Sequence, residues 1–547
     1  MTDAPAQSVD PMISDPSYLQ NAIARFGVIS SEAETIVAPD GGYCEWMLDL
    51  RRVFMDPHAI EICAEAFWER FKDAGPLQVA GFETAAIPLV TAIGIRGKAH
   101  GRKVNCFYVR KERKRTGLCG FIEGIPNRDP VIVVDDLVNN AQTLERLVGI
   151  LSRHDLSCAA AFAVVDYENR NGHDRLRRMG IPFYSICRLS HFGLYVPEAQ
   201  PVPNHFVERW RFNRGKSARY SLDARSGPAL CGELVIFGTD DGNVWAVKRD
   251  SGAVEWCYKV PGPPQVGVYC DPICIDGEVF VATSNGFLER LEADTGKSRG
   301  RLDVGDSISS APAFSRSAGA LFIKFGLDVF GSKGGVAAVD RASFEVVWKY
   351  HFERRLAGEI VHDDGRLIIV VASHGFVQAL DFSGQVRWKT SLQAQDAWSL
   401  HSVSPASGVV AASSGTELVA LDSASGEKLW RVATADALAP NIVWNSELLY
   451  GAERGGRLIE LAAESGEQRR SLFLAEKIYS GPVAHGSHLY VGTSGGHVFQ
   501  VDPRTFKIVG RFDCLERILN PIVSDGAGAY YVRTQENQVM RFDHVVA

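Results

Sequence analysis

The sequence predicts two folded units of different class: an α/β unit with a mainly parallel sheet, followed by an all-β unit built from repeats. Three observations predict this arrangement. The chain has 547 residues, more than one hydrophobic core usually organises, because single domains mostly contain about 100–200 residues. Helical and strand-like patterns alternate over roughly the first 200 residues. From residue 218 onward, short β-rich runs recur at a regular spacing.

The overall composition is that of a globular protein in water. Hydrophobic residues make up 46% and charged residues 22% of the chain, which excludes a largely disordered or fibrous protein. The formal net charge of −7 argues against a nucleic-acid-binding or polybasic membrane-binding protein. The first residues show no basic segment followed by an apolar core, and no apolar run reaches the roughly 18 residues of a membrane span. We therefore expect a cytoplasmic protein that binds no nucleic acid and does not span a membrane.

The eleven cysteines are scattered along the chain, and none forms a C-x-x-C pair. Their spacing does not suit a structural zinc site. Cysteines of a cytoplasmic protein are usually reduced and mostly buried. We expect reduced thiols here.

The first unit is predicted element by element from its hydrophobic pattern. Apolar residues at helical spacing predict helices over 59–75 and 141–154. Short apolar runs predict strands over 77–82, 129–136 and 158–167. Strands that alternate with helices form mainly parallel sheets.

The second unit is predicted from one recurring pattern: a strand, a turn with Asp and Ser/Thr-Gly, and a strand with Trp. The clearest copies lie at 244–256, 336–348, 377–388 and 418–430, and weaker ones at 288–296, 458–466, 498–505 and 539–543. Their spacing of about 40–48 residues is the length of one four-stranded propeller blade. Glycine suits the turn, and Trp suits packing between blades. Eight copies predict an eight-bladed propeller.

The ends of this predicted ring need one more strand. The last copy, 539–543, stops at what should be the third strand of its blade. We expect residues 218–222, just before the first copy, to supply the outer strand. Residues 197–217 are rich in Pro, Asn and charge, which is typical of a linker. The predicted organisation is thus a first domain over 1–196, a linker over 197–217 and a propeller over 218–547.

The segment 131–143, VIVVDDLVNNAQT, carries the most specific chemistry in the chain. A buried strand runs into Asp135 and Asp136, and a turn of small residues leads into a helix. Backbone N–H groups in such a turn form a cradle for an anion. The acids suit sugar hydroxyls beside that anion, or a magnesium ion. A phosphorylated ribose satisfies both demands; a strand end with solvated acids and a capped helix is the alternative.

This segment resembles the phosphoribosyl-diphosphate (PRPP) signature of type I phosphoribosyltransferases. Three further segments resemble the orotate phosphoribosyltransferase branch in the same order: WMLDLRRVFMDP at 46–57, VAGFETAAIPLV at 79–90, and FYVRKERKRTG at 107–117 followed by IEG at 122–124. Together they cover about residues 20–195. The repeats resemble the pyrroloquinoline-quinone-type propeller family, which includes quinoprotein dehydrogenases and a non-enzymatic outer-membrane assembly lipoprotein.

The resemblance implies the fold of the first unit, a type I phosphoribosyltransferase fold, and a set of site residues. The implied PRPP-binding residues are Asp135, Asp136, Asn139, Asn140, Ala141, Gln142 and Thr143. The implied diphosphate loop is Gly81, Phe82, Glu83, Thr84 and Ala85, and the implied catalytic cations are Arg110, Lys111 and Lys114. Magnesium is expected with PRPP. The basic loop of this family often completes a neighbouring subunit's site, which implies a homodimer. By itself, the basic run 110–115 also fits a solvated segment or a nucleic-acid patch.

The sequence departs from the family pattern at the phosphate turn and at several charged positions. The turn usually contains glycine, whereas here it is Asn139-Asn140-Ala141. Thr116 stands where the basic loop usually has His, and Thr is no general acid near neutral pH. The early Lys-Ser-Gly of orotate enzymes is replaced by Pro39-Asp40-Gly41, and Tyr167 replaces the base-contacting Arg. Arg170 is a candidate substitute for that Arg.

We expect a PRPP-dependent transferase that joins phosphoribose to a nitrogenous, pyrimidine-type, orotate-like base and releases diphosphate. The propeller is expected to be an interaction platform for a protein partner. The alternative is a PRPP-binding sensor that has lost turnover and uses the propeller as its output. A quinoprotein oxidoreductase is disfavoured, because the chain lacks an export signal and an adjacent cysteine pair. We therefore do not expect bound quinone.

Overall fold

The computed structural model describes residues 16–30, 46–110, 122–139, 141–168, 172–194, 205–212, 226–263, 266–308, 310–326, 333–354, 356–363, 367–372, 376–392, 399–404, 408–445, 447–474, 476–514, 516–534 and 537–545. The chain divides into two compact units, Met1–Pro201 and Val202–Ala547.

The first unit is built around one six-stranded sheet with the order β5-β4-β3-β6-β7-β8. Its strands are β3 (Gln78–Phe82), β4 (Asn105–Val109), β5 (Ile122–Glu123), β6 (Val131–Val138), β7 (Cys158–Asp166) and β8 (Phe183–Arg188). All of them are parallel except β5, which is antiparallel to β4. A separate pair, β1 (Val28–Ser30) and β2 (Trp46–Leu48), is antiparallel. The predicted α/β class is confirmed.

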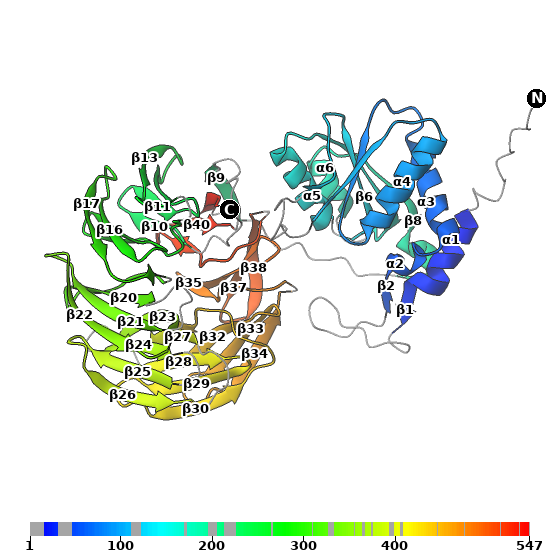
Figure 1. Ribbon diagram of the computed structural model, residues 1–547. Coiled ribbons are helices and arrows are strands. Elements are labelled where there is room, and N and C mark those ends of the chain that lie inside the picture. The colour runs from blue at the N-terminus through cyan, green and yellow to red at the C-terminus, as the bar shows by residue number, and fades with distance from the viewer. Residues whose placement is uncertain are drawn as a thin grey trace, which may run out of the picture. The chain divides into compact units, whose positions relative to one another are not determined.

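Helices cover both faces of this sheet, and each face has its own apolar cluster (Figure 1). One face carries α1 (Pro16–Ala22), the π-helix η2 (Ile23–Gly27), α2 (Leu50–Val53), α3 (Pro57–Arg70) and α4 (Ala86–Ala99). The other carries α5 (Gln142–Arg153) and α6 (Gly172–Arg178). The short 3₁₀ helix η3 (Leu189–Phe192) follows β8.

The start of α3 shows why the sequence forms a helix where predicted. Asp56 caps it by accepting a hydrogen bond from the backbone N–H of His58 at 2.9 Å, and Pro57 occupies the first helical position. Both are favoured at a helix N-terminus. The predicted elements over 59–75, 77–82, 129–136, 141–154 and 158–167 are all present, with boundaries shifted by a few residues.

The described residues of the second unit form eight antiparallel sheets. Seven of them are built from strands consecutive in the chain, and their strands are as follows: β10 (Ala229–Cys231), β11 (Leu234–Gly238), β12 (Asn243–Lys248) and β13 (Val254–Lys259); β14 (Ile273–Ile275), β15 (Glu278–Ala282), β16 (Phe287–Glu292) and β17 (Ser298–Asp303); β18 (Ser307–Ile308), β19 (Ala313–Ser315), β20 (Ala320–Gly326), β21 (Gly334–Asp340) and β22 (Glu345–Phe352); β23 (Leu356–Asp363), β24 (Leu367–Ala372), β25 (Phe376–Asp381) and β26 (Val386–Ser391); β27 (Ser399–Ser404), β28 (Val409–Ser414), β29 (Glu417–Asp422) and β30 (Lys428–Ala433); β31 (Val443–Trp444), β32 (Leu448–Glu453), β33 (Arg457–Ala462) and β34 (Gln468–Phe473); β35 (Val483–His485), β36 (His488–Gly492), β37 (His497–Asp502) and β38 (Lys507–Asp513). The remaining sheet consists of β39 (Val523–Ser524), β40 (Ala529–Arg533), β41 (Val539–His544) and β9 (Phe206–Phe212).

Apolar clusters join each sheet to the next and close the ring. One cluster joins the sheet of β10–β13 to that of β14–β17, and others follow in order along the chain. The cluster that contains Trp210, Tyr531 and Phe237 joins the sheet with β9 back to the first sheet. A ring in which every sheet has two neighbours is the architecture of a propeller. The number of sheets equals the number of repeats in the sequence.

The repeated Trp and Gly residues act between blades, as the sequence predicts. Trp348 of β22 donates its indole N–H to the backbone oxygen of Phe382 in the following sheet, at 2.9 Å. Gly384 in that turn has a φ of 84°, and a Cβ atom there would lie 2.9 Å from the Trp348 ring. Trp256, Trp388 and Trp430 make the equivalent hydrogen bond at 2.7–2.9 Å. Only glycine combines this backbone with this close approach.

The strand that closes the ring differs from the expected one. β9 pairs antiparallel with β41, with Trp210 opposite Arg541 and Phe206 opposite His544. The assignment of residues 197–217 to a linker is therefore wrong over Phe206–Phe212, and residues 218–222 lie outside the described residues. The reason is that β9, FVERWRF, carries the missing Trp of the eighth repeat: Trp210 donates to the backbone oxygen of Arg249 at 2.8 Å. Its charged neighbours hid this pattern.

One cysteine pair also differs from the expectation of reduced thiols. Cys231 of β10 and Cys274 of β14 form a disulfide, with a Cα–Cα distance of 5.7 Å. The two residues are 43 positions apart and lie on the first strands of adjacent blades, one residue out of register with each other, since Cys231 pairs with Leu234 whereas Ile275, and not Cys274, makes the corresponding pair with Glu278. Among the described free cysteines, burial raises the pKa of Cys106 and of Cys158 to about 11, which keeps these thiols protonated near neutral pH.

Candidate functional site

The predicted diphosphate loop begins at the end of β3, where the backbone has no room for side chains. A Cβ atom on Gly81 would lie 2.4 Å from the Cβ of Ala86 and 2.8 Å from the backbone oxygen of Val134. The backbone N–H of Glu83 donates to the oxygen of Val109 at 2.9 Å, and the Glu83–Thr84 peptide bond is cis. The loop is therefore held tightly between β4 and β6 before α4 begins.

The two acids lie at the end of β6. Asp135 is buried, with 8% of its surface exposed, and its Oδ1 accepts the backbone N–H of Asp136 at 3.1 Å. Burial raises the pKa of the Asp136 carboxyl, and its hydrogen bonds and the nearby Arg51 oppose that shift. Burial thus opposes the charged form of Asp136. A cation or a hydroxyl donor of a ligand beside this carboxylate would stabilise its charged form.

Arg51 stands beside this acid pair, and sequence reasoning did not single it out. Its guanidinium donates to both carboxylate oxygens of Asp49, at 2.7 and 2.9 Å. Asp49 also caps α2, because it accepts the backbone N–H of Arg51 at 3.1 Å. Asp49 raises the pKa of Arg51, and Asp136 adds to that shift. The Asp-Leu-Arg within 46–57 was the signal available in the sequence.

The phosphate loop, residues 139–143, connects β6 to α5. Ala141 caps the helix with a left-handed backbone, φ 56° and ψ 16°, and its methyl side chain makes no capping hydrogen bond. For a residue with a Cβ atom this conformation costs about 1–2 kcal/mol. Asn139 has a buried Oδ1 without a hydrogen-bond partner. Thr143 is exposed on the first turn of α5; Asn140 and the side chain of Gln142 lie outside the described residues. Uncapped N–H groups at a helix start suit an anion.

The basic loop begins at Arg110, directly after β4. Its Nη1 lies 3.6 Å from the carboxylate of Glu83 and 3.7 Å from that of Glu123, and its Nε is buried without a hydrogen-bond partner. Arg110 is thereby placed next to the predicted diphosphate loop. Lys111 and Lys114 lie outside the described residues, as does Thr116.

These groups gather because three strands are neighbours in the sheet. β4, β3 and β6 are adjacent and parallel, so the loops that follow them meet at one edge. That edge is where open α/β sheets bind their ligands. The structure therefore brings Gly81 to Ala85, Arg110, the acid pair and the phosphate loop together, as the sequence predicts.

Comparison with known proteins identifies this unit. The orotate phosphoribosyltransferase of Aquifex aeolicus is 30% identical over 151 residues, which are 27% of this chain and 82% of that protein. Through its first unit, the chain belongs to the orotate phosphoribosyltransferase family. The bovine uridine 5'-monophosphate synthase is also similar, with 26% identity over 165 residues that cover 33% of that protein.

The second unit has its own relatives. A family model described as outer membrane protein assembly factor BamB matches residues 207–330 and 332–480. The factor of that name from Yersinia pestis is 26% identical over 257 residues, and the chain spans 61% of its length. The crystal structure of the C-terminal WD40 domain of Sif2 superposes with a TM-score of 0.51 at 10% identity, covering 62% of this chain and 98% of that one. This last likeness shows the propeller fold alone.

Tyr167, the position at which the resemblance implies a base-contacting Arg, directly follows β7. Its ring centroid lies 6.2 Å from that of Trp46. Arg170 and the segment Pro39 to Gly41 lie outside the described residues.

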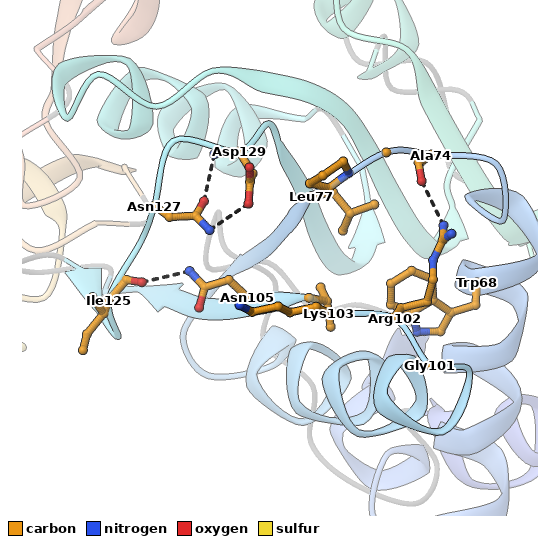
Figure 2. Close-up of a pocket in the computed structure, with 13 residues that line it drawn as sticks. Trp68, Ala74, Leu77, Gly101, Arg102, Lys103, Asn105, Ile125, Asn127 and Asp129 are labelled. Atoms are coloured by element: carbon orange, nitrogen blue, oxygen red, sulfur yellow. Dashed lines mark hydrogen bonds between the residues drawn. The ribbon is translucent and has the colours of Figure 1, made fainter.

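A second pocket, of about 770 Å³, lies at the opposite edge of the same sheet, before β3, β4 and β6 begin (Figure 2). Its polar groups bond to one another. Gln78, which is fully buried, accepts from Asn105 at 2.8 Å and from the N–H of Asn127 at 2.7 Å. Arg102 donates to the backbone oxygens of Phe71 and Ala74 at 2.9 and 3.0 Å. These bonds tie the loops of this edge together, which is a structural role.

Within the ranges that the structure describes, no group of three or more His, Cys, Asp or Glu side chains is arranged to hold a metal ion. No described helix has the length and apolar character needed to cross a membrane.

Proposed function

We propose that the chain transfers phosphoribose from PRPP to a nitrogenous base of the pyrimidine, orotate-like type and releases diphosphate. One observation carries the proposal: the acid pair Asp135 and Asp136, the start of helix α5 and the tightly packed loop at Gly81 lie at the same edge of the sheet. Membership of the orotate phosphoribosyltransferase family supports it. The similarity to the bovine uridine 5'-monophosphate synthase supports a base of the pyrimidine type.

Each group has a task in this reaction. Asp135 and Asp136 would accept hydrogen bonds from the ribose hydroxyls, and the loop 139–143 would bind the 5-phosphate through backbone N–H groups and Thr143. Breaking the anomeric C–O bond leaves positive charge on the ribose and negative charge on diphosphate. Backbone N–H groups of Gly81 to Ala85 and the cations of the basic loop, Arg110, Lys111 and Lys114, would stabilise the leaving diphosphate. Magnesium would arrive with PRPP and neutralise part of the same charge.

A second candidate function is a PRPP-binding sensor without turnover. Two observations favour it. Tyr167 stands at the position where the resemblance implies a base-contacting Arg, and the phosphate loop contains a left-handed Ala141 instead of glycine. In that case the propeller would transmit the bound state to a protein partner. In either case we propose the propeller as the partner-binding platform, without bound quinone, and a homodimer through the first unit.

The experiment is a screen of free bases with PRPP and magnesium, using the full chain and measuring diphosphate release and PRPP affinity. The control is the Asp135→Asn, Asp136→Asn double variant, which keeps the shape of the site and removes its charge. If the wild-type chain releases diphosphate with one of the bases and the double variant does not, the result supports the transferase. PRPP binding without release for any base supports the sensor. Equal PRPP affinity in the wild type and the variant, or no binding at all, contradicts both.

A further inference from the structure

Helix α6 begins directly against the phosphate loop. A Cβ atom added to Gly172, its first residue, would lie 2.6 Å from the backbone oxygen of Asn139 and 3.1 Å from Cγ1 of Val138. The backbone nitrogen of Ala141 lies 3.5 Å from the same point. The first distance is far inside van der Waals contact and involves backbone, so no side chain fits unless the loop moves. Gly172 therefore forms one wall of the loop.

Two side-chain pairs hold α6 in this place. His173 Nε2 lies 2.5 Å from Oδ2 of Asp166 at the end of β7, and Asp166 is only 3% exposed. The His173 ring also meets the edge of Phe183 at a centroid distance of 4.9 Å. Farther along the helix, Arg175 pairs with Glu145 of α5. Helix α6 is thus fixed to the sheet through Asp166 and to α5, the helix that follows the phosphate loop, through Glu145.

We infer that α6 positions the phosphate loop, with Gly172 and His173 as its positioning residues. The inference rests on the proposed function, because the 5-phosphate of PRPP is the ligand assigned to this loop. The loop contains no glycine, yet Ala141 adopts a φ of 56° while 96% of its surface is buried. A backbone in a sparsely populated conformation persists only when its surroundings determine it. Contact with α6, which lies outside the loop, holds the backbone of the loop in this conformation.

In the proposed site, the two ends of PRPP bind to different loops. The phosphate loop follows β6, whereas the diphosphate loop follows β3 and contacts β4 and β6. None of the described contacts of α6 involves Gly81 to Ala85. A disturbance at Gly172 should therefore weaken binding of ribose 5-phosphate and leave binding of inorganic diphosphate unchanged.

The experiment measures the affinity of the full chain for ribose 5-phosphate and, separately, for diphosphate with magnesium, by calorimetry. The variants are Gly172→Ala, His173→Ala and the conservative His173→Gln, which can still bond to Asp166. Gly75→Ala is the matched control, because a Cβ atom there would meet nothing within 4 Å. We expect Gly172→Ala and His173→Ala to weaken ribose 5-phosphate binding at least about tenfold, as displacements of this size do in positioned sites. In the same two variants, the affinity for diphosphate should stay within about twofold of the wild-type value. His173→Gln and Gly75→Ala should have wild-type affinity for both ligands.

Each other outcome counts against the inference. Unchanged ribose 5-phosphate affinity in both disruptive variants would overturn it, and an equal loss of both ligands would assign α6 a merely structural role. If Gly172→Ala does not fold, the His173 variants decide, because the His173 side chain is 47% exposed. A wild-type chain that binds neither ligand would instead refute the proposed function, which separates the two failures.

Discussion

The closing strand β9 offers the sharpest test of the propeller, because its residues look like a linker in the sequence. Trp210 is 92% buried between the sheet of β39–β41 and that of β10–β13, and it donates to the backbone oxygen of Arg249 at 2.8 Å. Replacing a buried Trp by Ala costs about 3–5 kcal/mol in lost burial and the cavity left behind. We expect Trp210→Ala to lower the free energy of unfolding of the second unit by about 4 kcal/mol.

The assay is differential scanning calorimetry of the full chain, in which the larger unit gives its own transition. For a unit of this size the expected loss lowers the Tm by about 5 °C. Val207→Ala is the matched control: it lies on the same strand but is 44% exposed, so its effect should stay within about 0.5 kcal/mol. A Trp210→Ala chain that melts like the Val207→Ala chain would refute the closure of the ring by β9.

Three further predictions concern single side chains. Burial raises the pKa of Asp136, so the folded state loses stability relative to the unfolded state as pH rises above the unfolded pKa of about 3.9. Asn cannot ionise, so the unfolding free energy of Asp136→Asn relative to the wild type should increase as pH rises above about 4. Urea titrations at several pH values measure this difference, and a difference that does not change with pH would contradict the prediction. Gln78→Leu should destabilise the first unit by about 2–4 kcal/mol, since it removes the four hydrogen bonds of this fully buried side chain, whereas Ile125→Ala, at an 87% exposed site, should not. Gly384→Ala should destabilise the propeller clearly more than Gly319→Ala, because both have positive φ but only Gly384 abuts a Trp ring; equal Tm values would disprove the steric argument.

The two units of the chain offer different kinds of surface for binding. In the proposed function, one edge of the sheet in the first unit binds a small, highly charged ligand. At the opposite edge, hydrogen bonds join Gln78, Asn105 and Asn127. The second unit uses its repeated Gly and Trp residues to join blades, and its repeated Asp residues accept hydrogen bonds within their own turns. Since these repeated residues are used for structure, a partner of the propeller would be recognised by residues that differ from blade to blade.

The sequence by itself determined the features that depend on local pattern. Strand and helix periodicity predicted the parallel sheet, and the repeat spacing predicted the ring of blades, because each blade is a short local unit. The acid pair, the phosphate turn and the loop at Gly81 were found in the sequence for the same reason: each is a contiguous segment between a strand and a helix. Even the left-handed Ala141 was foreseeable from the missing glycine.

Only the tertiary structure decided which distant residues meet. Three contacts join residues that are far apart in the chain: β9 closes the ring, Cys231 pairs with Cys274, and Gly172 packs against the phosphate loop. Arg51 and Asp136, also distant in the chain, attract each other electrostatically. The local sequence pattern cannot predict these interactions, because each forms only when segments that are far apart in the chain pack together in the fold. Phe206–Phe212 shows this best: its alternation is too short and too charged to predict a strand, and it becomes one because β41 offers an unpaired edge.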